Sequence, residues 1–526
     1  MTDSETIQIS ETIGAMIARL AKEQGGVIAF EFRGRTTTYA QLDANSDAAA
    51  RALLAGGVRP GGRIAYLGKN NDRYFELLCA SAKAGMVMVP IGWRLTAPEI
   101  AFLIKDAEVD ALFVEPAFLD VARNVTGITR ARLISVEEAV GDTSGYEDWR
   151  ATGDAAEIAL PKVDPSEPML QLYTSGTTGK PKGAMLAHAN IYPLRPICAQ
   201  EQLGWDLWGD EDVSLVTMPV AHISGTGWGL VAMYNGAKSI VLPEFDVTAI
   251  LKAISSEHIS RVFLVPAAIQ AVLRDPAVAQ SDFSRLRYIL YGASPIPLPV
   301  LQEAIEVFGC GFVQNYGMTE TCGTIVALPP EDHSAGGNPR MASAGRPLPG
   351  VHIRIVDEDL NEVPTGSTGE ILISSPTTMI GYWDRPEATQ EALHNGWMRT
   401  GDAGYLDEDG YLFVQDRIKD MIITGGENVY PAEVESALQA HPDVDEVAII
   451  GIPDERWGEA VTAVVVPHGE TIDGDALCVW ARERLATYKV PKSVIVRDEL
   501  PRNASGKILR RMLREPFWKG RDRAVN

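Results

Sequence analysis

Strand-like and helix-like stretches alternate along most of this chain, and that alternation restricts the fold more than any other feature of the sequence. An apolar run at 63–67 is followed by a helical pattern near 74–84, by Gly85 where that helix should stop, and by a second apolar run at 86–91. The same order of strand, helix and strand returns at 286–291, 299–308 and 311–314. Short apolar strands separated by helices are typical of βαβ units around a parallel sheet. The sequence therefore predicts an α/β fold.

The pattern changes twice along the chain. With 526 residues, of which 46% are hydrophobic and 22% charged, the chain has material for several cores. Strand-rich sequence punctuated by glycine indicates a β-rich subdomain at about 340–416. Beyond it, a helix that begins at Pro431 precedes an apolar strand at 444–451. We therefore predict a large domain over residues 1–416 and a small α+β domain over residues 417–526.

The formal net charge of the chain is −23, and it is unevenly distributed. An acidic surface repels nucleic acid and anionic membranes at long range, so neither is an expected partner, and an anionic ligand must be held by local positive charge. Between residues 481 and 523 the chain carries thirteen Lys and Arg against five Asp and Glu. Such a segment is either a solvated helical tail or a basic cap over phosphates.

Neither a membrane span nor a disulfide framework is predicted. The first residues are acidic, without the basic and apolar regions of a signal peptide, and no uninterrupted apolar run reaches roughly 18 residues. The five cysteines are odd in number, far apart and never in CxxC spacing, so reduced thiols are expected. We expect a cytoplasmic protein.

The most informative segment is Tyr173-Thr-Ser-Gly-Thr-Thr-Gly-Lys-Pro-Lys-Gly183, which follows a short predicted strand at 169–173. Glycines let backbone amides approach an anion, hydroxyls add donors and lysines supply charge, so the segment predicts a phosphate-binding loop. A Walker loop would need Ser or Thr where this chain has Pro181. A flexible linker is the plainer alternative, but linkers seldom carry two lysines around a proline directly after a strand. The candidate phosphate-binding residues are Thr174, Ser175, Gly176, Thr177, Thr178, Gly179, Lys180 and Lys182.

Four further motifs follow in order: Tyr316-Gly-Met-Thr-Glu320, Thr400-Gly-Asp402, Asp416-Arg417 and Pro501-Arg-Asn-Ala-Ser-Gly-Lys507. Together with the loop, they make the chain resemble the adenylate-forming superfamily of acyl-CoA synthetases, adenylation domains and luciferases. One match of this length is weak, whereas five in the same order are specific. The resemblance implies that the protein uses ATP to activate a carboxylic acid as an acyl-adenylate and then transfers the acyl group to coenzyme A (CoA).

The resemblance also implies roles around the phosphates. Glu320 would bind Mg²⁺ with the Thr174 hydroxyl as a helper, and Thr319 would contact the α-phosphate. Lys507 would bridge the substrate carboxylate and the α-phosphate, where an ammonium can neutralise the charge that develops during adenylation. Mg²⁺ usually keeps several waters and needs only one or two carboxylates. Without the other motifs, Glu320 would be a surface acid at a helix entry, and Lys507 one more solvated lysine.

The nucleoside positions follow from the same resemblance. Asp402 resembles the aspartate that holds the ribose hydroxyls, since a carboxylate can accept two hydrogen bonds, and Arg417 would assist it. Taken alone, Thr-Gly-Asp is an ordinary turn. The carboxyl ends of strands are where open α/β sheets bind ligands. The candidate adenine-binding residues after the two predicted strands are Gly292, Ala293, Ser294, Asn315, Tyr316 and Gly317.

Elements near the C-terminus resemble those that line the pantetheine tunnel of CoA ligases, namely Gly425, Gly426, Glu427 and Trp457. Paired glycines suit a narrow channel where backbone passes close to a thin ligand. The plainer interpretation is a β-turn, with Trp457 packed in a core. The weaker candidates for the nucleotide phosphate of CoA are Lys489 and Lys492, because some relatives have arginine where this chain has Val490.

A lysine required for adenylation would obstruct the thiol in the second step. The family resolves this conflict by rotating a mobile C-terminal domain, and Lys419 matches the hinge position. Hinges are commonly a few boundary residues that absorb a change in backbone conformation, which agrees with the predicted domain boundary.

The acid itself is only partly constrained. Amino-acid-activating relatives place an aspartate early in the pocket, and the corresponding segment 219–229 has no acidic residue, so an α-amino acid is not expected. His222 matches an aromatic or histidine gate beside the acyl carboxylate, although a lone histidine is also an ordinary core residue. Three glycines at 225, 227 and 229 would leave room for a large acyl group. A fatty acid and an aryl or cyclic acid stay equally open.

Several alternatives stay open as well. The acyl group could be delivered to a carrier protein instead of free CoA, and a luciferase-like oxygenase is a more distant option. A non-catalytic nucleotide-binding protein of the same fold should have lost Lys507, Glu320 or Asp402, and all three are present. Dimers are common in the family, so a homodimer is an expected assembly.

Overall fold

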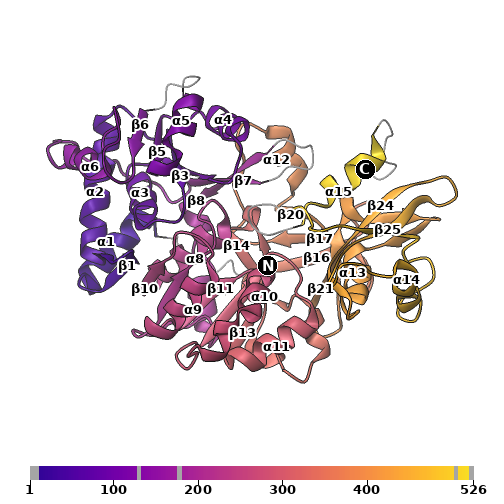
Figure 1. Ribbon diagram of the computed structural model, residues 1–526. Helices are drawn as coiled ribbons and strands as arrows, with labels where there is room; N and C mark the ends of the chain where they lie inside the picture. The colour runs from indigo at the N-terminus through magenta and orange to yellow at the C-terminus, as the bar shows by residue number, and fades with distance from the viewer. Residues whose placement is uncertain (1–10, 127–131, 175–180, 503–507, 520–526) are drawn as a thin grey trace, which may run out of the picture.

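The structure is a computed structural model that describes residues 11–126, 132–174, 181–502 and 508–519. A large N-terminal part of α/β sheets occupies most of the molecule, and a smaller C-terminal domain with its own sheet lies at one end (Figure 1). The predicted fold class, with a large domain of α/β and β-rich parts and a small α+β domain, is therefore confirmed.

A nine-stranded sheet forms the centre of the N-terminal part. Its strands, in spatial order, are β15 (Arg346–Pro347), β14 (Gly323–Leu328), β13 (Gly311–Met318), β12 (Tyr288–Gly292), β11 (Arg261–Leu264), β9 (Val213–Val216), β10 (Lys238–Val241), β1 (Ile28–Phe32) and β2 (Arg35–Thr38). The strands from β13 to β1 pair in parallel, while β15, β14 and β2 add antiparallel edges. The carboxyl ends of the parallel strands therefore share one edge of the sheet.

A second, seven-stranded sheet contains the segment before the predicted phosphate loop. Its order is β18 (Gly381–Tyr382), β8 (Lys182–Ala187), β7 (Pro168–Thr174), β4 (Val87–Gly92), β3 (Arg63–Gly68), β5 (Ala111–Val114) and β6 (Arg132–Ser135). Strands β7, β4, β3, β5 and β6 are parallel, and β8 and β18 are antiparallel.

Helices surround and separate these two sheets. They are α1 (Ile13–Gln24), α2 (Tyr39–Ala55), α3 (Asp72–Lys83), α4 (Ala97–Asp106), α5 (Leu119–Thr126), α6 (Tyr146–Asp154), α7 (Arg195–Gln200), α8 (Ile223–Tyr234), α9 (Val247–Ser256), α10 (Pro266–Arg274) and α11 (Leu298–Phe308). The short 3₁₀ segments are η1 (Pro116–Phe118), η2 (His188–Asn190), η3 (Pro276–Gln280), η4 (Thr319–Thr321), η5 (Pro330–Asp332) and η6 (Pro339–Ala342).

Helix α3 lies between the two sheets, and every one of its residues is buried. It contacts β4 of one sheet and β1 of the other, and it packs against α8. At that contact the Tyr74 hydroxyl lies 2.6 Å from the Thr226 hydroxyl, and a Cβ added at Gly229 would lie 2.3 Å from the ring of Phe75. Gly229 is therefore required for helix packing.

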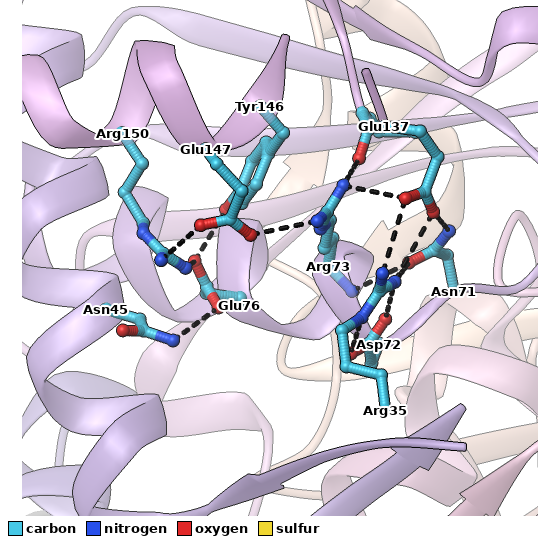
Figure 2. A network of polar contacts seen from close by, with 11 residues as sticks. Arg35, Asn45, Asn71, Asp72, Arg73, Glu76, Glu137, Tyr146, Glu147 and Arg150 are labelled. Atoms are coloured by element: carbon cyan, nitrogen blue, oxygen red, sulfur yellow. Dashed lines mark hydrogen bonds and ion pairs between the residues drawn. The ribbon is translucent and has the colours of Figure 1, made fainter. Parts of the chain in front are cut away.

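A network of charged side chains links the two sheets around α3 (Figure 2). Arg35 of β2 pairs with Asp72 at 2.7 Å, and Arg73 pairs with Glu137, just after β6, at 2.8 Å. Arg73 also pairs with Glu147 of α6 at 2.9 Å. Because β2 belongs to the nine-stranded sheet and β6 to the seven-stranded one, these pairs tie the two sheets together at one end of α3.

The β-rich subdomain and the C-terminal domain complete the fold. The subdomain contains β16 (His352–Val356), β17 (Gly369–Ser374), α12 (Pro386–Ala392), β19 (Leu393–His394), β20 (Trp397–Leu406) and β21 (Leu412–Arg417), and η7 (Ile418–Asp420) follows it. The C-terminal domain contains β22 (Ile422–Thr424), β23 (Glu427–Val429), α13 (Pro431–Gln439), β24 (Val444–Asp454), β25 (Gly458–Pro467), α14 (Gly474–Arg482), β26 (Ser493–Val496) and α15 (Arg510–Trp518).

The buried cores of the described residues divide between Leu412 and Ile422. Three clusters of buried apolar side chains use residues up to Leu412, and two others use residues from Ile422 onward. Arg510 of α15 pairs across this division with Asp416 of β21 at 3.1 Å, and within the C-terminal domain with Glu435 of α13 at 2.6 Å. Each part thus has its own core, and charged contacts connect them at the chain crossing.

Most predicted elements are present, with one clear difference in length. Helix α11 ends at Gly309, which has a left-handed φ of 60°, as its position in the sequence predicted. Strand β13, predicted over 311–314, extends to Met318 because its second half pairs with β14 in antiparallel fashion. All five cysteines are free thiols, and none of the described helices is long and apolar enough to cross a membrane.

Candidate active site

The predicted adenine-binding residues meet where β12 and β13 end. Gly292 pairs with Asn315 in register, and a Cβ added at Gly292 would lie 2.1 Å from the Asn315 carbonyl oxygen. The Asn315 side-chain Oδ1 is buried and has no hydrogen-bond partner among the described residues. Ala293 adopts a left-handed φ of 71°, an unfavourable conformation for a residue with a side chain. The strand ends therefore provide a tight backbone turn beside an amide acceptor that lacks a donor.

Three neighbouring positions complete this edge of the sheet. Ser294 is half-buried after the turn, and Gly317 lies so close to β14 that an added Cβ would be 1.8 Å from the Gly323 carbonyl oxygen. Thr319 is half-buried at the start of η4, next to Glu320. The residues that the sequence placed on two separate strands thus share one edge.

Glu320 is 5% exposed, so it is not the surface acid that the plainer interpretation describes. Its Oε1 accepts hydrogen bonds from the Thr174 hydroxyl at 3.2 Å and from the Tyr382 hydroxyl at 2.9 Å. Thr174 ends β7 and Tyr382 belongs to β18, so three elements converge on this one oxygen. The Oε2 atom of Glu320 accepts no hydrogen bond from the part of the chain that the structure describes.

This corner suits Mg²⁺. Glu320 offers a free carboxylate oxygen, and Thr174 offers a hydroxyl oxygen beside it. The described residues contain no cluster of three or more His, Cys, Asp or Glu side chains that could hold a metal ion. A single carboxylate with a hydroxyl is the donor set of an ion that takes its remaining ligands from water and phosphate, which is how Mg²⁺ usually binds.

Asp402, Tyr316 and Arg417 form a second polar cluster. The Tyr316 hydroxyl donates to Oδ2 of Asp402 at 2.8 Å, and Nε of Arg417 lies 3.1 Å from Oδ1. Asp402 and Arg417 face each other across β20 and β21, and Asp402 is 7% exposed. Burial alone would lower the pKa of Arg417, but Asp402 and Glu320 raise it above its usual value. The side chain of Asp402 is thus held in place by Tyr316 and Arg417, and a carboxylate oxygen has more than one lone pair with which to accept hydrogen bonds.

His222 lies directly before α8, at the helix N-cap position. Its Nε2 is buried and has no partner among the described residues. Burial, with a contribution from the nearby Arg94, lowers the pKa of His222 to about 4. The imidazole is therefore neutral at pH 7, and a buried ring nitrogen without a partner among the described residues is unusual for an ordinary core histidine.

A cavity of about 130 Å³ opens beside these groups. At one end it is lined by Ala293, Asn315 and Gly317, and its walls are largely apolar and aromatic. Of the three glycines predicted to leave room for an acyl group, only Gly227 lines it. Gly225 instead allows close packing, because a Cβ there would lie 2.3 Å from the Pro219 carbonyl oxygen. Gly229 packs against α3, as described above.

The predicted phosphate loop is described only at its two ends. Thr174 contacts Glu320, and Nζ of Lys182 lies 5.2 Å from the centre of the Tyr382 ring. Thus both ends of the loop lie at the Glu320 corner. The predicted residues that lie outside the described residues are Ser175, Gly176, Thr177, Thr178, Gly179, Lys180 and Lys507.

Gly425 and Gly426 form the two-residue turn of a hairpin between β22 and β23. Their φ angles of 61° and 86° are those of a type I′ turn, which favours glycine at both positions. A Cβ at Gly425 would lie 2.9 Å from the ring of Trp457, whose side chain is 36% exposed. The plainer interpretation is right about the turn and wrong about Trp457, which is not part of a core. Glu427 is exposed beside the turn.

The remaining candidates in this region differ in their surroundings. Lys489 is bound to Glu433 at 2.6 Å, whereas Nζ of Lys492 lies 5.8 Å from the centre of the Trp457 ring. Lys419 lies in η7 at the division between the two sets of cores, where burial and the neighbouring Arg417 lower its pKa. Lys492 is thus near the hairpin turn, while Lys489 is committed to an ion pair.

Known proteins with this sequence pattern and architecture were found. The AMP-binding enzyme family model matches residues 17–383, and the AMP-binding enzyme C-terminal domain model matches residues 433–507. The fatty acid–[acyl-carrier-protein] ligase ScoC of Streptomyces coeruleorubidus is 42% identical over 494 residues, which cover 94% of each chain. A feruloyl-CoA synthase of an Amycolatopsis species is 40% identical over 510 residues, which cover 97% of this chain and 99% of that protein. ATP-bound MatB from Rhodopseudomonas palustris has a TM-score of 0.85 at 31% identity, covering 97% of this chain and 99% of that one.

The fold and the contacts at the sheet edge, together with these matches, define an adenylate-forming enzyme of the acid–thiol ligase class. The chain belongs to the AMP-binding enzyme family. The resemblance drawn from the five motifs is therefore confirmed, and ATP and CoA are the co-substrates that this family uses with a carboxylic acid.

Two features of the site escaped the sequence argument. Tyr382 hydrogen-bonds Glu320, although 62 residues separate them in the chain. Arg195 and Asp206 form an ion pair that lines the apolar cavity. The short run Gly381-Tyr-Trp383 is at most a weak sequence signal for a functional tyrosine. No motif in the sequence connects Arg195 or Asp206 with the pocket.

Proposed function

We propose that this protein is an ATP-dependent acyl-CoA ligase that adenylates a carboxylic acid and then forms its CoA thioester. One observation carries the proposal: the Glu320 corner, the Asp402 cluster and the acyl cavity meet around the ends of β12 and β13. A nucleotide bound along this edge would present its α-phosphate between the Glu320 corner and the mouth of the cavity. A carboxylate held there is placed for in-line attack on phosphorus.

Several roles follow for the chain's own residues. Glu320 and Thr174 would hold Mg²⁺, which when bound supplies positive charge to the phosphate oxygens and the leaving pyrophosphate. Thr319 is a candidate donor to the α-phosphate, and Lys180 and Lys182 are candidate phosphate contacts with the other loop residues. Asp402 and Arg417 would hold the ribose.

The adenine would lie at the strand ends. Asn315 is suited to accept a hydrogen bond from the exocyclic amine, because its buried Oδ1 lacks a donor. Gly292 and Gly317 allow the neighbouring strands to approach closely at this edge, because a Cβ at either position would meet the carbonyl oxygen of the next strand. Tyr316 would connect the two parts of the nucleoside, since its hydroxyl donates to Asp402.

His222 is proposed as the gate beside the acyl carboxylate. Its lowered pKa keeps it neutral, so it can rotate or approach an anionic carboxylate without a fixed charge of its own. Its unpartnered Nε2 supports a role toward a ligand more than a role in packing.

For the second half-reaction we propose the rotation of the C-terminal domain, with the boundary at 416–417 and Lys419 at the hinge. The separation of the cores between Leu412 and Ile422 supports such a unit. The Gly425-Gly426 turn, Glu427 and Trp457 are the proposed contacts of the pantetheine arm. Lys507→Ala should then slow adenylation by orders of magnitude and leave thioester formation from a preformed acyl-adenylate largely intact. Equal damage to both half-reactions would contradict the rotation.

The substrate is proposed to be a fatty acid or an aryl or cyclic acid. The cavity wall is largely apolar and aromatic, and the segment 219–229 carries no acidic residue to pair with an α-ammonium group. The names of the relatives span this range, from a fatty acid ligase to a feruloyl-CoA synthase. Transfer to a carrier protein is a second candidate, because the relative ScoC is a ligase of that kind. The expected homodimer stays a prediction.

The proposal is tested by ATP-dependent pyrophosphate release from the purified protein across fatty, aryl and cyclic acids, with and without CoA. We expect at least one acid to drive release that CoA accelerates, with AMP and a thioester as products. Release that CoA does not change, but that a loaded carrier protein accelerates, would favour the carrier-protein alternative. No release with any acid would contradict the proposal.

A further inference from the structure

The cavity beside the active site runs along the parallel strands of the nine-stranded sheet. Its lining includes Ala293 and Asn315 at the carboxyl ends of β12 and β13, and Arg261 at the amino end of β11. Arg261 pairs in register with Tyr288, the first residue of β12, so about four residues of strand separate the two ends. At about 3.3 Å per residue, the cavity extends roughly 13 Å from the nucleotide edge.

An ion pair between the half-buried Arg195 and the buried Asp206 stands at this remote end. Nη1 of Arg195, at the start of α7, donates to Oδ1 of Asp206, and both residues line the cavity. Asp206 is 8% exposed, and it follows Trp205, whose carbonyl oxygen accepts from Arg261. Burial raises the pKa of Asp206, an effect that Arg195 only partly offsets. The pair is therefore positioned opposite the nucleotide end and is poorly solvated.

This pair has hydrogen-bonding capacity left over. The neighbouring Arg261 uses both Nη atoms, which donate to the carbonyls of Trp205 and Leu207, while its Nε lies 3.2 Å from Oδ2 of Asp212 in an ion pair without a hydrogen bond. In contrast, Nε and Nη2 of Arg195 and Oδ2 of Asp206 have no partner among the residues that the structure describes.

The rest of the cavity wall at this end is aromatic. Trp208 and Trp228 have ring centroids 5.5 Å apart, and Trp228 lies 6.4 Å from Phe263. All three residues line the cavity, as does Trp205. Unpaired donors and an acceptor within an apolar wall favour a ligand group that satisfies both, and they penalise one that satisfies neither.

We propose that the acyl pocket selects acids that carry a hydroxyl group at the end remote from the carboxylate. A hydroxyl can accept a hydrogen bond from Arg195 while it donates one to Oδ2 of Asp206. An alkyl or unsubstituted aryl terminus leaves both groups unpaired, and a second carboxylate would face the charge of Asp206. This inference rests on the proposed function, because it takes the cavity to be the acyl site.

The test uses two pairs of acids that differ by the terminal hydroxyl: 4-hydroxycinnamic against cinnamic acid, and 10-hydroxydecanoic against decanoic acid. The dissociation constants are measured by calorimetry on the intact protein, and kcat/KM is measured by pyrophosphate release. A hydrogen bond to a charged group is worth about 1.5–3 kcal/mol, so we expect the hydroxylated member of at least one pair to bind about tenfold or more tightly. Equal dissociation constants within both pairs would overturn the proposal.

A double variant provides the second arm. Arg195→Met with Asp206→Leu replaces the whole pair by apolar side chains, a change that buried ion pairs often tolerate without loss of folding. We expect this variant to bind the hydroxylated and unhydroxylated acids about equally. The matched control is Arg19→Gln with Glu23→Gln, which removes an exposed ion pair on α1 and should keep the preference for the hydroxylated acid. Retention of the preference in the Arg195 and Asp206 variant would refute the assignment. If neither unhydroxylated nor hydroxylated acid supports pyrophosphate release while calorimetry shows the preference, the proposed function fails and the binding inference stands.

Discussion

Glu320 shows how a single carboxylate can combine structure and chemistry. One of its oxygens is committed to the hydroxyls of Thr174 and Tyr382, and that commitment fixes the orientation of the carboxyl group. The other oxygen accepts no hydrogen bond from the described residues and can bind a cation. The two functions can be separated by mutation because they use different atoms.

Glu320→Gln should reduce the rate of adenylation about 100-fold or more, because a neutral amide cannot provide the charge that the developing transition state requires through its metal. Tyr382→Phe removes only one hydrogen bond to Oε1 and should cost about tenfold at most. The measurement is pyrophosphate release under saturating ATP and acid. Equal effects of the two substitutions would mean that Glu320 acts only through its orientation.

Several histidines make the stability of the protein depend on pH. Burial lowers the pKa of His188 and His222 to about 4, and it also lowers the pKa of His333. The unfolded chain takes up these protons near pH 6.5, while the folded protein does so only near pH 4, so the unfolded state binds more protons in between. Stability should therefore fall as the pH is lowered from about 6.5 to about 4, by at most about 3 kcal/mol for each histidine.

His222→Asn should remove the contribution of His222 to this loss, since an amide does not titrate, and should leave the contributions of His188 and His333. The free energy of unfolding is measured by denaturant titration at several values between pH 7 and pH 4. His188→Asn is the matched control for the pH effect. The pKa of His188 is lowered to the same value, but its Nδ1 accepts a hydrogen bond from the backbone amide of Ile13. A slope with pH that neither substitution changes would show that both imidazoles stay solvated.

At the scale of elements, the hairpin between β22 and β23 tests the proposed pantetheine contact. Gly425→Leu should impair thioester formation more than pyrophosphate release, because the new side chain would displace the ring of Trp457. Gly426→Leu is the matched control: it has the same left-handed conformation, but open space surrounds its Cβ position. Separate assays of the two half-reactions provide the measurement. A greater loss of pyrophosphate release in Gly425→Leu would remove the tunnel assignment.

The glycines of α8 show that one residue type serves different purposes within a single helix. Gly229 accommodates Phe75 of α3, Gly225 accommodates the Pro219 carbonyl, and Gly227 lines the cavity that we propose for the acyl group. Helix periodicity explains the division, since residues two apart point to different sides of a helix. A substitution at Gly227 would therefore change the wall of the cavity, and one at Gly229 would affect packing.

For the whole molecule, the charged network of Figure 2 joins the two large sheets and should contribute to stability more than to catalysis. Arg73→Met removes donors from Glu137, from Glu147 and from the Val136 carbonyl. We expect a loss of about 2 kcal/mol, seen as a lower midpoint of the first thermal transition, with adenylation kinetics at 25 °C nearly unchanged.

Arg51→Met is the matched control for Arg73→Met. Arg51 makes one half-exposed pair with Asp47 at 3.5 Å within α2, and Asp47 keeps its pair with Lys83 when Arg51 is replaced. Ion pairs that solvent reaches contribute roughly 0–1 kcal/mol. If the two substitutions shift the thermal midpoint equally, the network is not a link between the sheets. The measurement is differential scanning calorimetry on the full chain.

The sequence by itself determined the features that depend on local patterns. Alternating apolar strands and helices determined the α/β class, and Gly309 marked the end of α11 because only a residue that tolerates a left-handed φ fits there. The five motifs pointed to the family and to Glu320 and Asp402. Such signals are readable because backbone conformation and motif spacing involve residues that are close in the chain.

Only the tertiary structure decided which residues share a site. It brought Tyr382 to Glu320, it paired Arg195 with the buried Asp206 at the end of the cavity, and it left the side chain of Trp457 exposed at 36%. It also extended β13 by pairing it with β14. Each of these outcomes depends on which distant segments pack together, and packing is determined by the whole set of buried contacts, which no local pattern of residues specifies.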